Sequence, residues 1–253
     1  MHGMDVRTRR QRITEAVQAT TPVPVSQLAI EFGCSEMTIR RDLDALERDG
    51  VLRRTHGSAV SVNLRADEVP YGARAFQAGE AKGRIGRAVA DLIAKGETVV
   101  LDAGTTTAEV ALALRGREVT ILPLGVRTMV DLAYDEHVHL IAPGGDVRPG
   151  ELVVTGDLAE VAFERLHFDT FVLGCCGIDD VKGVTTHVPA DARVKRAALA
   201  ASRRTIAVAD ASKLGAVAFG HVCAIDALDR LVTDAAAEET AALAALGLQV
   251  DRV

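Results

Sequence analysis

The chain has 253 residues, of which 48% are hydrophobic and 3% aromatic, and its formal net charge is −6 at pH 7. This length and hydrophobic content allow a substantial core, in one large domain or in two smaller ones. The few aromatic side chains leave little material for stacking unpaired bases, which argues against a protein that binds single-stranded nucleic acid.

The net charge is unevenly distributed along the chain. Residues 1–58 contain nine arginines and eight acidic residues, a net charge of +1, whereas the remainder contains 20 basic and 27 acidic residues, a net charge of −7. A surface that binds phosphate must therefore be local. The candidate cations are Arg7, Arg9, Arg10 and Arg12, the pair Arg40 and Arg41, and the pair Arg53 and Arg54.

The cysteines and the hydrophobic pattern bear on the compartment and on cofactors. Cys34, Cys175, Cys176 and Cys223 show no metal-ligand spacing, and the adjacent pair is poorly placed for a disulfide. The histidines are also scattered without ligand spacing. No stretch approaches the roughly 18 uninterrupted apolar residues of a transmembrane helix, and the N-terminus lacks the apolar segment of a secretion signal. We therefore expect a cytoplasmic protein with no metal, no cofactor and no membrane partner.

The chain begins with the pattern of two helices joined by a breaker. A weak apolar stripe over residues 8–19 predicts a first helix, which ends at the proline-containing segment 20–24. Ser26 is a suitable N-cap for a short second helix over residues 27–32. Gly33 then supplies a tight turn into the next helical segment, as a helix-turn-helix requires.

A third helix is predicted to follow the N-cap Ser35 and to end before Gly50. Its buried face is defined by apolar residues at i, i+4 and i+7, namely Ile39, Leu43 and Leu46. Thr38, Arg40 and Arg41 then project away from the core. A short polar helix with arginines on its free face suits the major groove of DNA.

Residues 51–60 predict a β-hairpin, because two apolar runs flank the polar pair His56 and Gly57. A helix-turn-helix followed by such a hairpin is a winged helix. The helical pattern alone also fits a generic helical hairpin with solvated charges, and the hairpin favours the winged helix.

The run from Ser35 to Val60 closely resembles the winged helix of the DeoR family of bacterial transcriptional regulators. The matching residues are Thr38, Ile39, Arg40, Arg41, Asp42, Leu43, Leu46, Gly50, Leu52, Arg54, His56 and Gly57. The resemblance implies a repressor that binds double-stranded operator DNA, and palindromic half-sites call for a homo-oligomer, a dimer or a tetramer. The candidate DNA-binding residues are Ser35, Thr38, Arg40, Arg41, Arg53, Arg54 and His56. The residues themselves support phosphate contacts but do not separate these from base contacts.

Residues 61–78 lack a sustained period, and we interpret them as a linker between a DNA-binding domain, 1–60, and an effector-sensing domain, 79–253. From residue 80 onward, helical segments alternate with apolar runs rich in β-branched residues, which indicates an α/β fold with a mostly parallel sheet covered on both faces. The runs are Thr98–Leu101, Val119–Leu122, Val138–Ile141, Thr170–Leu173, Thr205–Val208 and Leu228–Val232.

Ligands of parallel sheets bind outside the carboxyl ends of the strands. The loop from Asp102 to Thr107 combines a glycine with threonine hydroxyls and free amides at a helix N-terminus, which suits a phosphate. The lysines Lys82 and Lys213, two of only five in the chain, and Arg148 supply cations near the same predicted edge. The alternatives are an ordinary helix cap for the loop and a solvated surface charge for each cation, above all for Arg148.

Residues 82–234 also resemble the sensor domain of the DeoR family, which is similar to ribose-5-phosphate isomerase and implies a phosphorylated sugar as effector. The shared residues implied to line its site are Lys82, Asp102–Thr106, Gly144, Gly145, Gly156, Gly183–Thr186 and Asp210–Lys213. The candidate effector-binding residues are Lys82, Asp102, Gly104, Thr105, Thr106, Thr107, Gly144, Gly145, Arg148, Asp179 and Lys213.

Three departures from the family and isomerase patterns affect the functional prediction. The segment 123–125 reads Pro-Leu-Gly where the family has Thr-Asn-Ser, which removes groups that hold a sugar. The loop 174–179 keeps Asp179 but lacks paired acids, and Val194 precedes Lys195 where the isomerase has an acid. Isomerisation of a sugar needs a carboxylate within reach of the C2 proton. We therefore predict a regulator and no enzyme.

Three alternatives remain beside the regulator. One is an isomerase-like enzyme fused to a DNA-binding module, and another is a constitutive DNA-binding protein with a vestigial ligand site. The third is a redox sensor built on Cys175 and Cys176, although cysteines at buried strand ends usually act as small hydrophobic residues.

Overall fold

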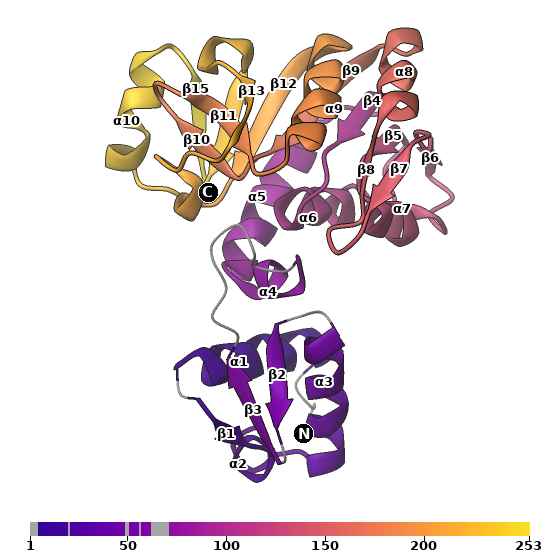
Figure 1. Ribbon diagram of the computed structural model, residues 1–253. Helices are drawn as coiled ribbons and strands as arrows, with labels where there is room; N and C mark the ends of the chain where they lie inside the picture. Colours follow the sequence, from indigo (N-terminus) through magenta and orange to yellow (C-terminus); the bar gives the residue numbers. More distant parts are fainter. Residues whose placement is uncertain (1–4, 20, 49–50, 56, 62–70) are drawn as a thin grey trace. The chain divides into compact units, whose positions relative to one another are not determined.

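The computed structural model describes residues 5–19, 21–48, 51–55, 57–61 and 71–253. It divides into two compact units, Met1–Gly79 and Glu80–Val253. The first unit contains α1 (Val6–Ala19), β1 (Val23–Pro24), α2 (Val25–Glu31), α3 (Glu36–Arg48), β2 (Leu52–Thr55), β3 (Ser58–Ser61) and α4 (Tyr71–Phe76) (Figure 1).

The winged helix predicted from the sequence is present in the first unit. Gly33, with φ of +62°, makes the turn between α2 and α3, where the left-handed conformation favours glycine. The hairpin pairs β2 with β3, and β1 joins β3 to complete a three-stranded antiparallel sheet. The Val25 amide donates a hydrogen bond of 3.0 Å to the Gly57 carbonyl, which ties the hairpin turn to the start of α2.

The core of the first unit confirms the predicted face of α3. Ile39, Leu43 and Leu46 are fully buried and pack with apolar residues of α1 and α2. The segment 61–78, predicted to be a linker, contains the helix α4, and Ala73 of α4 is buried in this same core. A six-residue helix is too short to show a sustained period in the sequence. Residues 62–70 of that segment, and Gly50 at the predicted end of α3, lie outside the described residues.

The second unit is an α/β structure in which helices and strands alternate along most of the chain. Its elements are α5 (Gly79–Asp91), β4 (Thr98–Leu101), α6 (Thr105–Leu114), β5 (Val119–Pro123), α7 (Val126–Leu132), β6 (Val138–Leu140), β7 (Asp146–Arg148), β8 (Val153–Thr155), α8 (Asp157–Arg165), β9 (Phe168–Gly174), β10 (Gly177–Asp179), β11 (Gly183–Thr186), α9 (Pro189–Ala200), β12 (Ser202–Ala209), the short helix η1 (Ala211–Lys213), β13 (Gly220–Cys223), η2 (Ile225–Ala227), β14 (Arg230–Thr233), α10 (Ala237–Ala245) and β15 (Gln249–Arg252).

A parallel sheet of seven strands forms the centre of the second unit, in the order β15-β14-β12-β9-β4-β5-β6. All six apolar runs predicted to be strands lie in this sheet, and β15 extends it at one edge. From β4 the chain builds toward β6, and from β9 it builds in the opposite direction toward β15. The strand order therefore reverses between β4 and β9, and such a switch point is where ligands of open parallel sheets bind.

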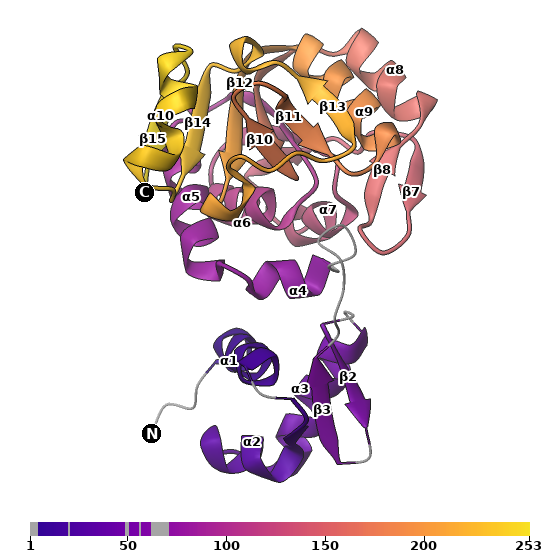
Figure 2. The same cartoon turned by 60° about the vertical axis from the view of Figure 1, so that its left-hand side comes forward.

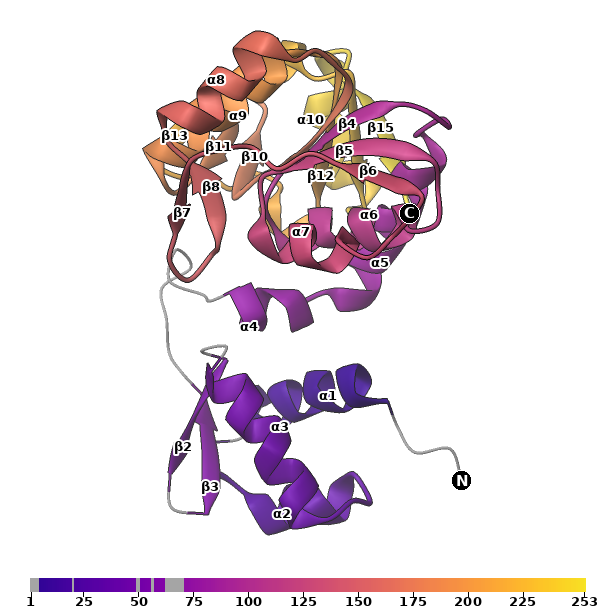
Figure 3. The ribbon, with the colours of Figure 1, turned by 90° about the vertical axis from the view of Figure 1, so that its right-hand side faces the viewer.

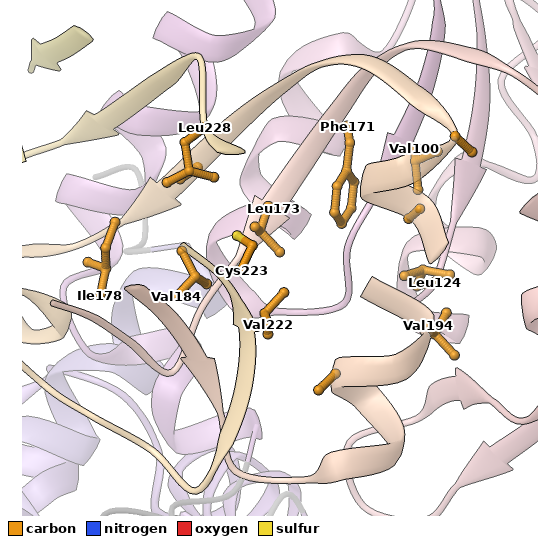
Figure 4. Packing of buried hydrophobic residues seen from close by; sticks show 14 of the residues in the cluster. Val100, Leu124, Phe171, Leu173, Ile178, Val184, Val194, Val222, Cys223 and Leu228 are labelled. Atoms are coloured by element: carbon orange, nitrogen blue, oxygen red, sulfur yellow. The ribbon is translucent and has the colours of Figure 1, made fainter. Parts of the chain in front are cut away.

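Apolar side chains cover both faces of the seven-stranded sheet. Val99 and Leu101 of β4 face one core, which α5, α6 and α7 close, whereas Val100 faces a second core, which α8 and α9 close. Figure 3 shows the sheet between these two sets of helices. Figure 4 shows the second core, in which Val100 and Phe171 of the sheet, Val194 of α9 and Val222 of β13 share one interior. The prediction of a sheet covered on both faces is confirmed.

Two small antiparallel sheets accompany the parallel one, β10-β11-β13 and β7-β8. Figure 2 shows the first of them beside α9. Gly183 permits the close pairing of β11 with β13, because a Cβ atom there would lie 2.2 Å from the Cys223 carbonyl oxygen. These strands have only three or four residues, and β13 lies far from β11 in the chain, so local alternation did not reveal them.

Two absences hold for the part of the chain that the structure describes. No helix in it is long and apolar enough to cross a bilayer. Its His, Cys, Asp and Glu side chains form no group of three or more that could hold a metal ion.

Candidate DNA interface and effector site

The first turn of α3 is fixed by a side-chain cap. The Ser35 Oγ atom accepts a hydrogen bond of 3.2 Å from the Thr38 amide, and the two hydroxyl oxygens lie 2.9 Å apart. This confirms Ser35 as the N-cap, which satisfies one of the free amides at the helix start. The Ser35 hydroxyl therefore has a structural function, because its hydrogen bond to the Thr38 amide fixes the start of α3.

The arginines of α3 lie on its outward side, as predicted. Arg40 and Arg41 are both exposed. The Arg40 guanidinium lies 3.1 Å from a carboxylate oxygen of Glu36 one turn earlier, and both side chains remain about half exposed. Such a pair contributes little to stability, about 0.3–0.5 kcal/mol, so the Arg40 side chain can exchange Glu36 for a phosphate at small cost.

The wing is joined to α3 through Arg54. Its backbone amide donates a hydrogen bond of 2.8 Å to Glu47, and its guanidinium pairs with Asp44. Arg53, the residue before Arg54 in β2, points to the opposite face of the strand and is exposed. The pair Arg53 and Arg54 is therefore split into one residue that holds the wing and one that faces solvent. His56, predicted at the wing tip, lies outside the described residues.

Arginines of α1 have partners inside the first unit. Arg9 and Arg10 direct their Nε atoms at the two carboxylate oxygens of Asp42, at 2.6 Å and 3.0 Å, and Asp42 is only 2% exposed. The hydrogen bond to Asp42 raises the pKa of Arg9. Arg12 stacks over the Phe32 ring, with its guanidinium carbon 5.2 Å from the ring centre. These three members of the predicted phosphate-binding cluster thus have structural contacts, and nothing is described of the Arg7 side chain.

Asp102 lies at the switch point of the large sheet, directly after β4. Its carboxylate accepts hydrogen bonds from the amides of Ala103 and Gly174, at 2.8 Å and 2.9 Å, and lies 2.6 Å from the Lys195 ammonium. The side chain is fully buried. Asp102 therefore joins the ends of β4 and β9 and does not present its carboxylate to solvent.

Lys195 reaches this position from α9. Its ammonium also donates a hydrogen bond of 2.8 Å to the Gly174 carbonyl. Burial lowers the pKa of Lys195, but the neighbouring Asp102 carboxylate outweighs it, so the pKa is raised overall. Burial raises the pKa of the Asp102 carboxyl, and the Lys195 charge opposes that rise. The two groups form a buried ion pair whose remaining hydrogen-bonding capacity is largely used by backbone.

A second ion pair lies one turn earlier on α9. The Arg148 guanidinium of β7 contacts both carboxylate oxygens of Asp191, at 3.3 Å and 2.7 Å, and Asp191 is 7% exposed. Arg148, predicted as a free cation for the effector, is thus neutralised by a buried acid. One face of α9 therefore connects through charges to β7 and to the end of β4.

The loop from Gly104 to Thr107 turns the chain from β4 into α6. Gly104 precedes the helix without a side-chain cap, and the Thr107 hydroxyl donates to its carbonyl at 3.1 Å. Thr105 and Thr107 are buried, whereas Thr106 is half-buried. The amides of the first turn of α6 thus lie at the switch point together with one partly accessible hydroxyl.

Lys82 and Lys213 lie near the end of β12, the strand next to β9. The Lys82 ammonium is buried, 3.8 Å from an Asp210 carboxylate oxygen, and the other Asp210 oxygen caps η1 through Ser212. Lys213 ends η1 and is half-buried. Its positive charge lies close enough to Cys175, just after β9, to affect the pKa of that thiol. The structure thus brings both predicted lysines to the carboxyl-end edge of the sheet.

Other predicted effector residues have contacts of a different kind. Gly145, in the loop before β7, packs against β8 and α8, and a Cβ atom there would lie 2.4 Å from the Thr155 carbonyl oxygen. Gly144 packs beside Leu158 of α8. Asp179 closes the turn after β10 by accepting hydrogen bonds from the amides at 181 and 182. These contacts lie within the loops and the small sheets themselves and account for all three residues without a ligand.

Of the two adjacent cysteines, Cys175 lacks the lowered thiol pKa that a redox sensor needs. Burial raises the pKa of the Cys175 thiol to about 12. The Cys176 sulfur lies 3.6 Å from the Thr186 hydroxyl. Since the thiolate is the species that is oxidised, a raised pKa makes Cys175 unreactive at neutral pH.

Comparison with known proteins follows the same division of the chain. The model of the DeoR-like helix-turn-helix domain matches residues 9–65, and that of the DeoR C-terminal sensor domain matches residues 77–235, more than half of the chain. The chain belongs to the DeoR family of transcriptional regulators.

Relatives of this DeoR-family regulator match it along most of their length. It is 32% identical over 231 residues to the uncharacterized HTH-type transcriptional regulator YulB of Bacillus subtilis (strain 168), covering 91% of this chain and 90% of that protein. It is 35% identical over 228 residues to the transcriptional repressor AccR of Agrobacterium fabrum, covering 89% and 88%. Ribose 5-phosphate isomerase A of Methanocaldococcus jannaschii matches 54% of each chain with a TM-score of 0.40 and 12% identity.

These comparisons confirm several predictions for the DeoR-family regulator. The family, the α/β fold with a winged helix-turn-helix and the function as a DNA-binding transcriptional regulator are as predicted. The relatives are named regulators and repressors, which confirms a regulator in place of an enzyme.

Sequence reasoning gave no role to Asp191 and none to the ion pair of Lys195. A signal was present, because Asp191, Val194, Lys195 and Ala198 follow the i, i+3, i+4, i+7 spacing of a buried stripe on α9. Charged residues in phase with the core of a helix must find charged partners, since an unpaired buried charge is costly. The partners themselves lie 93 and 43 residues away and were not predictable.

Proposed function

We propose that this DeoR-family regulator is a cytoplasmic repressor of carbohydrate-metabolism genes. A phosphorylated sugar bound at the switch point would modulate its affinity for operator DNA. The winged helix would bind the DNA as a homo-oligomer, a dimer or a tetramer, because palindromic half-sites require two copies. The effector shifts the equilibrium only by its differential affinity for the two states, commonly about 1–3 kcal/mol.

The DNA side of the proposal rests on the cations left available on α3 and the wing. Arg41 and Arg53 are exposed, and Arg40 has only a solvent-exposed partner. The other candidate DNA-binding residues are Ser35, Thr38, Arg54 and His56. Arginines on the free face of a helix suit both phosphate oxygens and guanine edges.

One observation at Gly104 carries the effector side of the proposal. Its φ of 163° is extended backbone that any residue adopts, and the nearest atom to an added Cβ would be the Thr107 hydroxyl oxygen at 3.5 Å, an ordinary contact. Folding therefore does not require glycine at this position. We attribute the glycine to the close approach of an anionic ligand to the amides of α6, as at other phosphate-binding helix starts.

The cations at the same edge support a phosphate in particular. Lys82 and Lys213 both lie near the end of β12, and the Asp210 carboxylate balances only one of their two positive charges. The proposed contacts are the Gly104–Thr107 amides, the Thr106 hydroxyl and these two lysines. Asp102 and Arg148 act indirectly, by holding the loop and α9. Gly144, Gly145 and Asp179, also predicted to bind the effector, are proposed to shape neighbouring loops.

The experiment compares effector response with operator affinity in single variants. Pure protein is screened with pentose and hexose phosphates by thermal shift, and operator binding is measured with and without each compound. We expect Gly104→Ala and Lys213→Ala to keep operator affinity and the unliganded melting temperature, but to lose the ligand-induced rise and the release of DNA. Lys182→Ala, an exposed lysine in the turn after β10, is the matched control and should respond like wild type.

Two outcomes would contradict the effector proposal. If no compound changes the melting temperature or the operator affinity of wild type, the chain is a constitutive DNA-binding protein. If wild type converts a sugar phosphate and Lys213→Ala does not, the chain is an isomerase-like enzyme.

A further inference from the structure

Met37, the second residue of α3, is a large apolar side chain that the first unit leaves 59% exposed. Single exposed apolar residues are common on protein surfaces and need no partner. Met37 is distinguished by its place, in the first turn of the helix assigned to the major groove. In helix-turn-helix proteins the N-terminal residues of that helix contact the base edges.

The helix phase places Met37 at the centre of the outward face of α3. Successive residues of a helix are rotated by about 100° around its axis. Leu46, which is fully buried, follows Met37 by nine positions, or about two and a half turns, so the two side chains lie on opposite sides of α3. Arg40 and Arg41 follow Met37 by three and four residues and therefore flank it on the same side. The outward face thus has an apolar centre with a cation on each side.

The charged side chains around Met37 are mostly paired with one another on the surface of the first unit. Glu36 pairs with Arg40, and Asp44 pairs with Arg54 of the wing. Among the described residues, Arg41 has no acidic side chain within ion-pair distance, which leaves one cation in surplus on this face. The balance suits a surface on which arginines contact the phosphates at the edges and the centre meets the bases.

We propose that Met37 reads a thymine methyl group in the major groove of the operator, and so selects a T·A pair at one position of each half-site. The thymine C5 methyl is the apolar group that a base pair presents in the major groove. A flexible thioether side chain can follow that group and has no donor to pair with guanine or adenine. The proposal rests on α3 as the helix that enters the groove.

The test removes the methyl group and the side chain separately. Duplexes preferred by the wild-type protein are first selected from a randomised DNA library, and each thymine of the preferred site is then replaced by uracil, which differs only in the methyl. We expect one position per half-site where the replacement weakens wild-type binding by about fourfold, the effect of about one buried methyl. Met37→Ala should bind the intact site about fourfold more weakly and show no further loss at that position.

Two further variants sharpen the comparison. Met37→Leu keeps an apolar side chain and should keep the thymine dependence. Ile30→Ala removes another exposed apolar side chain, on α2, and should give the wild-type uracil profile. Circular dichroism and size-exclusion chromatography check that all variants fold and assemble alike.

The proposal is overturned if Met37→Ala shows the same uracil profile as wild type, or if Ile30→Ala loses the thymine dependence equally. It is also overturned if Met37→Ala alters the oligomeric state, which would assign the side chain to a protein contact. Failure of α3 as the recognition helix would appear separately, as full operator affinity in both Arg40→Ala and Arg41→Ala.

Discussion

Gly104 and Gly145 are glycines for opposite physical reasons, although both were predicted to bind the effector. Gly104 is extended and has room for a methyl group. Gly145 has φ of +130°, in a region that side chains rarely adopt, and a Cβ atom there would lie 2.4 Å from a carbonyl oxygen. At Gly145 the glycine is required by packing and by the backbone, so ligand binding need not be invoked to explain it.

Replacing these two glycines should therefore separate stability from ligand response. We expect Gly145→Ala to lower the free energy of unfolding by about 2–4 kcal/mol, because backbone atoms of β8 cannot yield as a flexible side chain would. Gly104→Ala should change it by less than about 1 kcal/mol. Urea denaturation of both variants measures this, and a loss of similar size in the two would contradict the distinction.

Individual contacts were predictable only where they are local in sequence. The Ser35 cap was predicted because the serine stands directly before the helix that it caps, and the Gly104 loop because strand, glycine and threonines are consecutive. The ion pair of Lys195 joins residues 93 positions apart, so it depends on the register of α9 against the sheet. No local pattern contains that register.

Buried charge also fixes the packing of whole helices, as α1 against α3 shows. Two arginines of α1 converge on Asp42 of α3, which is almost fully buried. Apolar packing alone would tolerate small rotations of α1, whereas two directed contacts to one carboxylate restrict them. The orientation of α3 is thereby fixed on its inner side, opposite the arginines of its outward face.

Removing Asp42 should destabilise the first unit specifically. Asp42→Ala removes the buried carboxylate that pairs with both Arg9 and Arg10, and breaking a buried ion pair by removing one partner costs about 3–5 kcal/mol. Asp44→Ala is the matched control in the same helix, because Asp44 is about half exposed and its pair with Arg54 is worth less than about 1 kcal/mol. Hydrogen exchange of α1 and α3 amides measures the difference. Equal protection in the two variants would contradict the role of Asp42.

The edge between β4 and β9 provides a pH-dependent contact. The Asp169 carboxylate accepts hydrogen bonds from the amide and the hydroxyl of Thr98, at 3.0 Å and 2.8 Å, which lower its pKa from the ordinary value of 3.8. The folded state thus binds this proton more weakly than the unfolded state. The contribution to stability is present above about pH 4 and is lost as the pH falls through the lowered pKa.

Asp169→Asn removes the titrating group while keeping a side chain of similar size. We expect the difference in unfolding free energy between wild type and Asp169→Asn to be constant above about pH 5 and to shrink at lower pH. Chemical denaturation across that range measures it. A difference that grows as the pH falls would contradict the assigned direction.

At the scale of elements, the sequence predicted the strands with long apolar runs and missed the short ones. All six predicted runs are in the parallel sheet, because continuous burial on both faces leaves a strong local signal. β10, β11 and β13 have three or four residues each and are defined by their pairing with one another. The helix α4, inside the predicted linker, was missed for the same reason of length.

Across the whole molecule, the acidic charge is concentrated outside the DNA-binding region. Residues 1–58 have a net charge of only +1, and three of their nine arginines, Arg9, Arg10 and Arg54, are paired with Asp42 and Asp44. Few arginines remain to displace counterions from DNA. Operator affinity should therefore depend on a small number of phosphate contacts, and its salt dependence should be shallow.

Arg41 is the arginine whose removal should change that dependence most clearly. We expect Arg41→Ala to weaken operator binding and to reduce the slope of log K against log salt by about one, the effect of a single lost phosphate contact. Arg115→Ala, an exposed arginine of the second unit, should leave the slope unchanged. Titrations at several salt concentrations measure this, and an unaltered slope in Arg41→Ala would remove the arginine from the interface.

The two ion pairs on α9 also constrain how the family member can evolve. A substitution of Asp102 or Lys195 alone leaves a buried charge without its partner, which lowers the free energy of unfolding. Replacing both by apolar residues of similar volume avoids this cost. The same holds for Arg148 and Asp191, one helical turn away. Among homologues we therefore expect each pair to change jointly or not at all, so that the two residues of α9 vary only together with Asp102 and with Arg148.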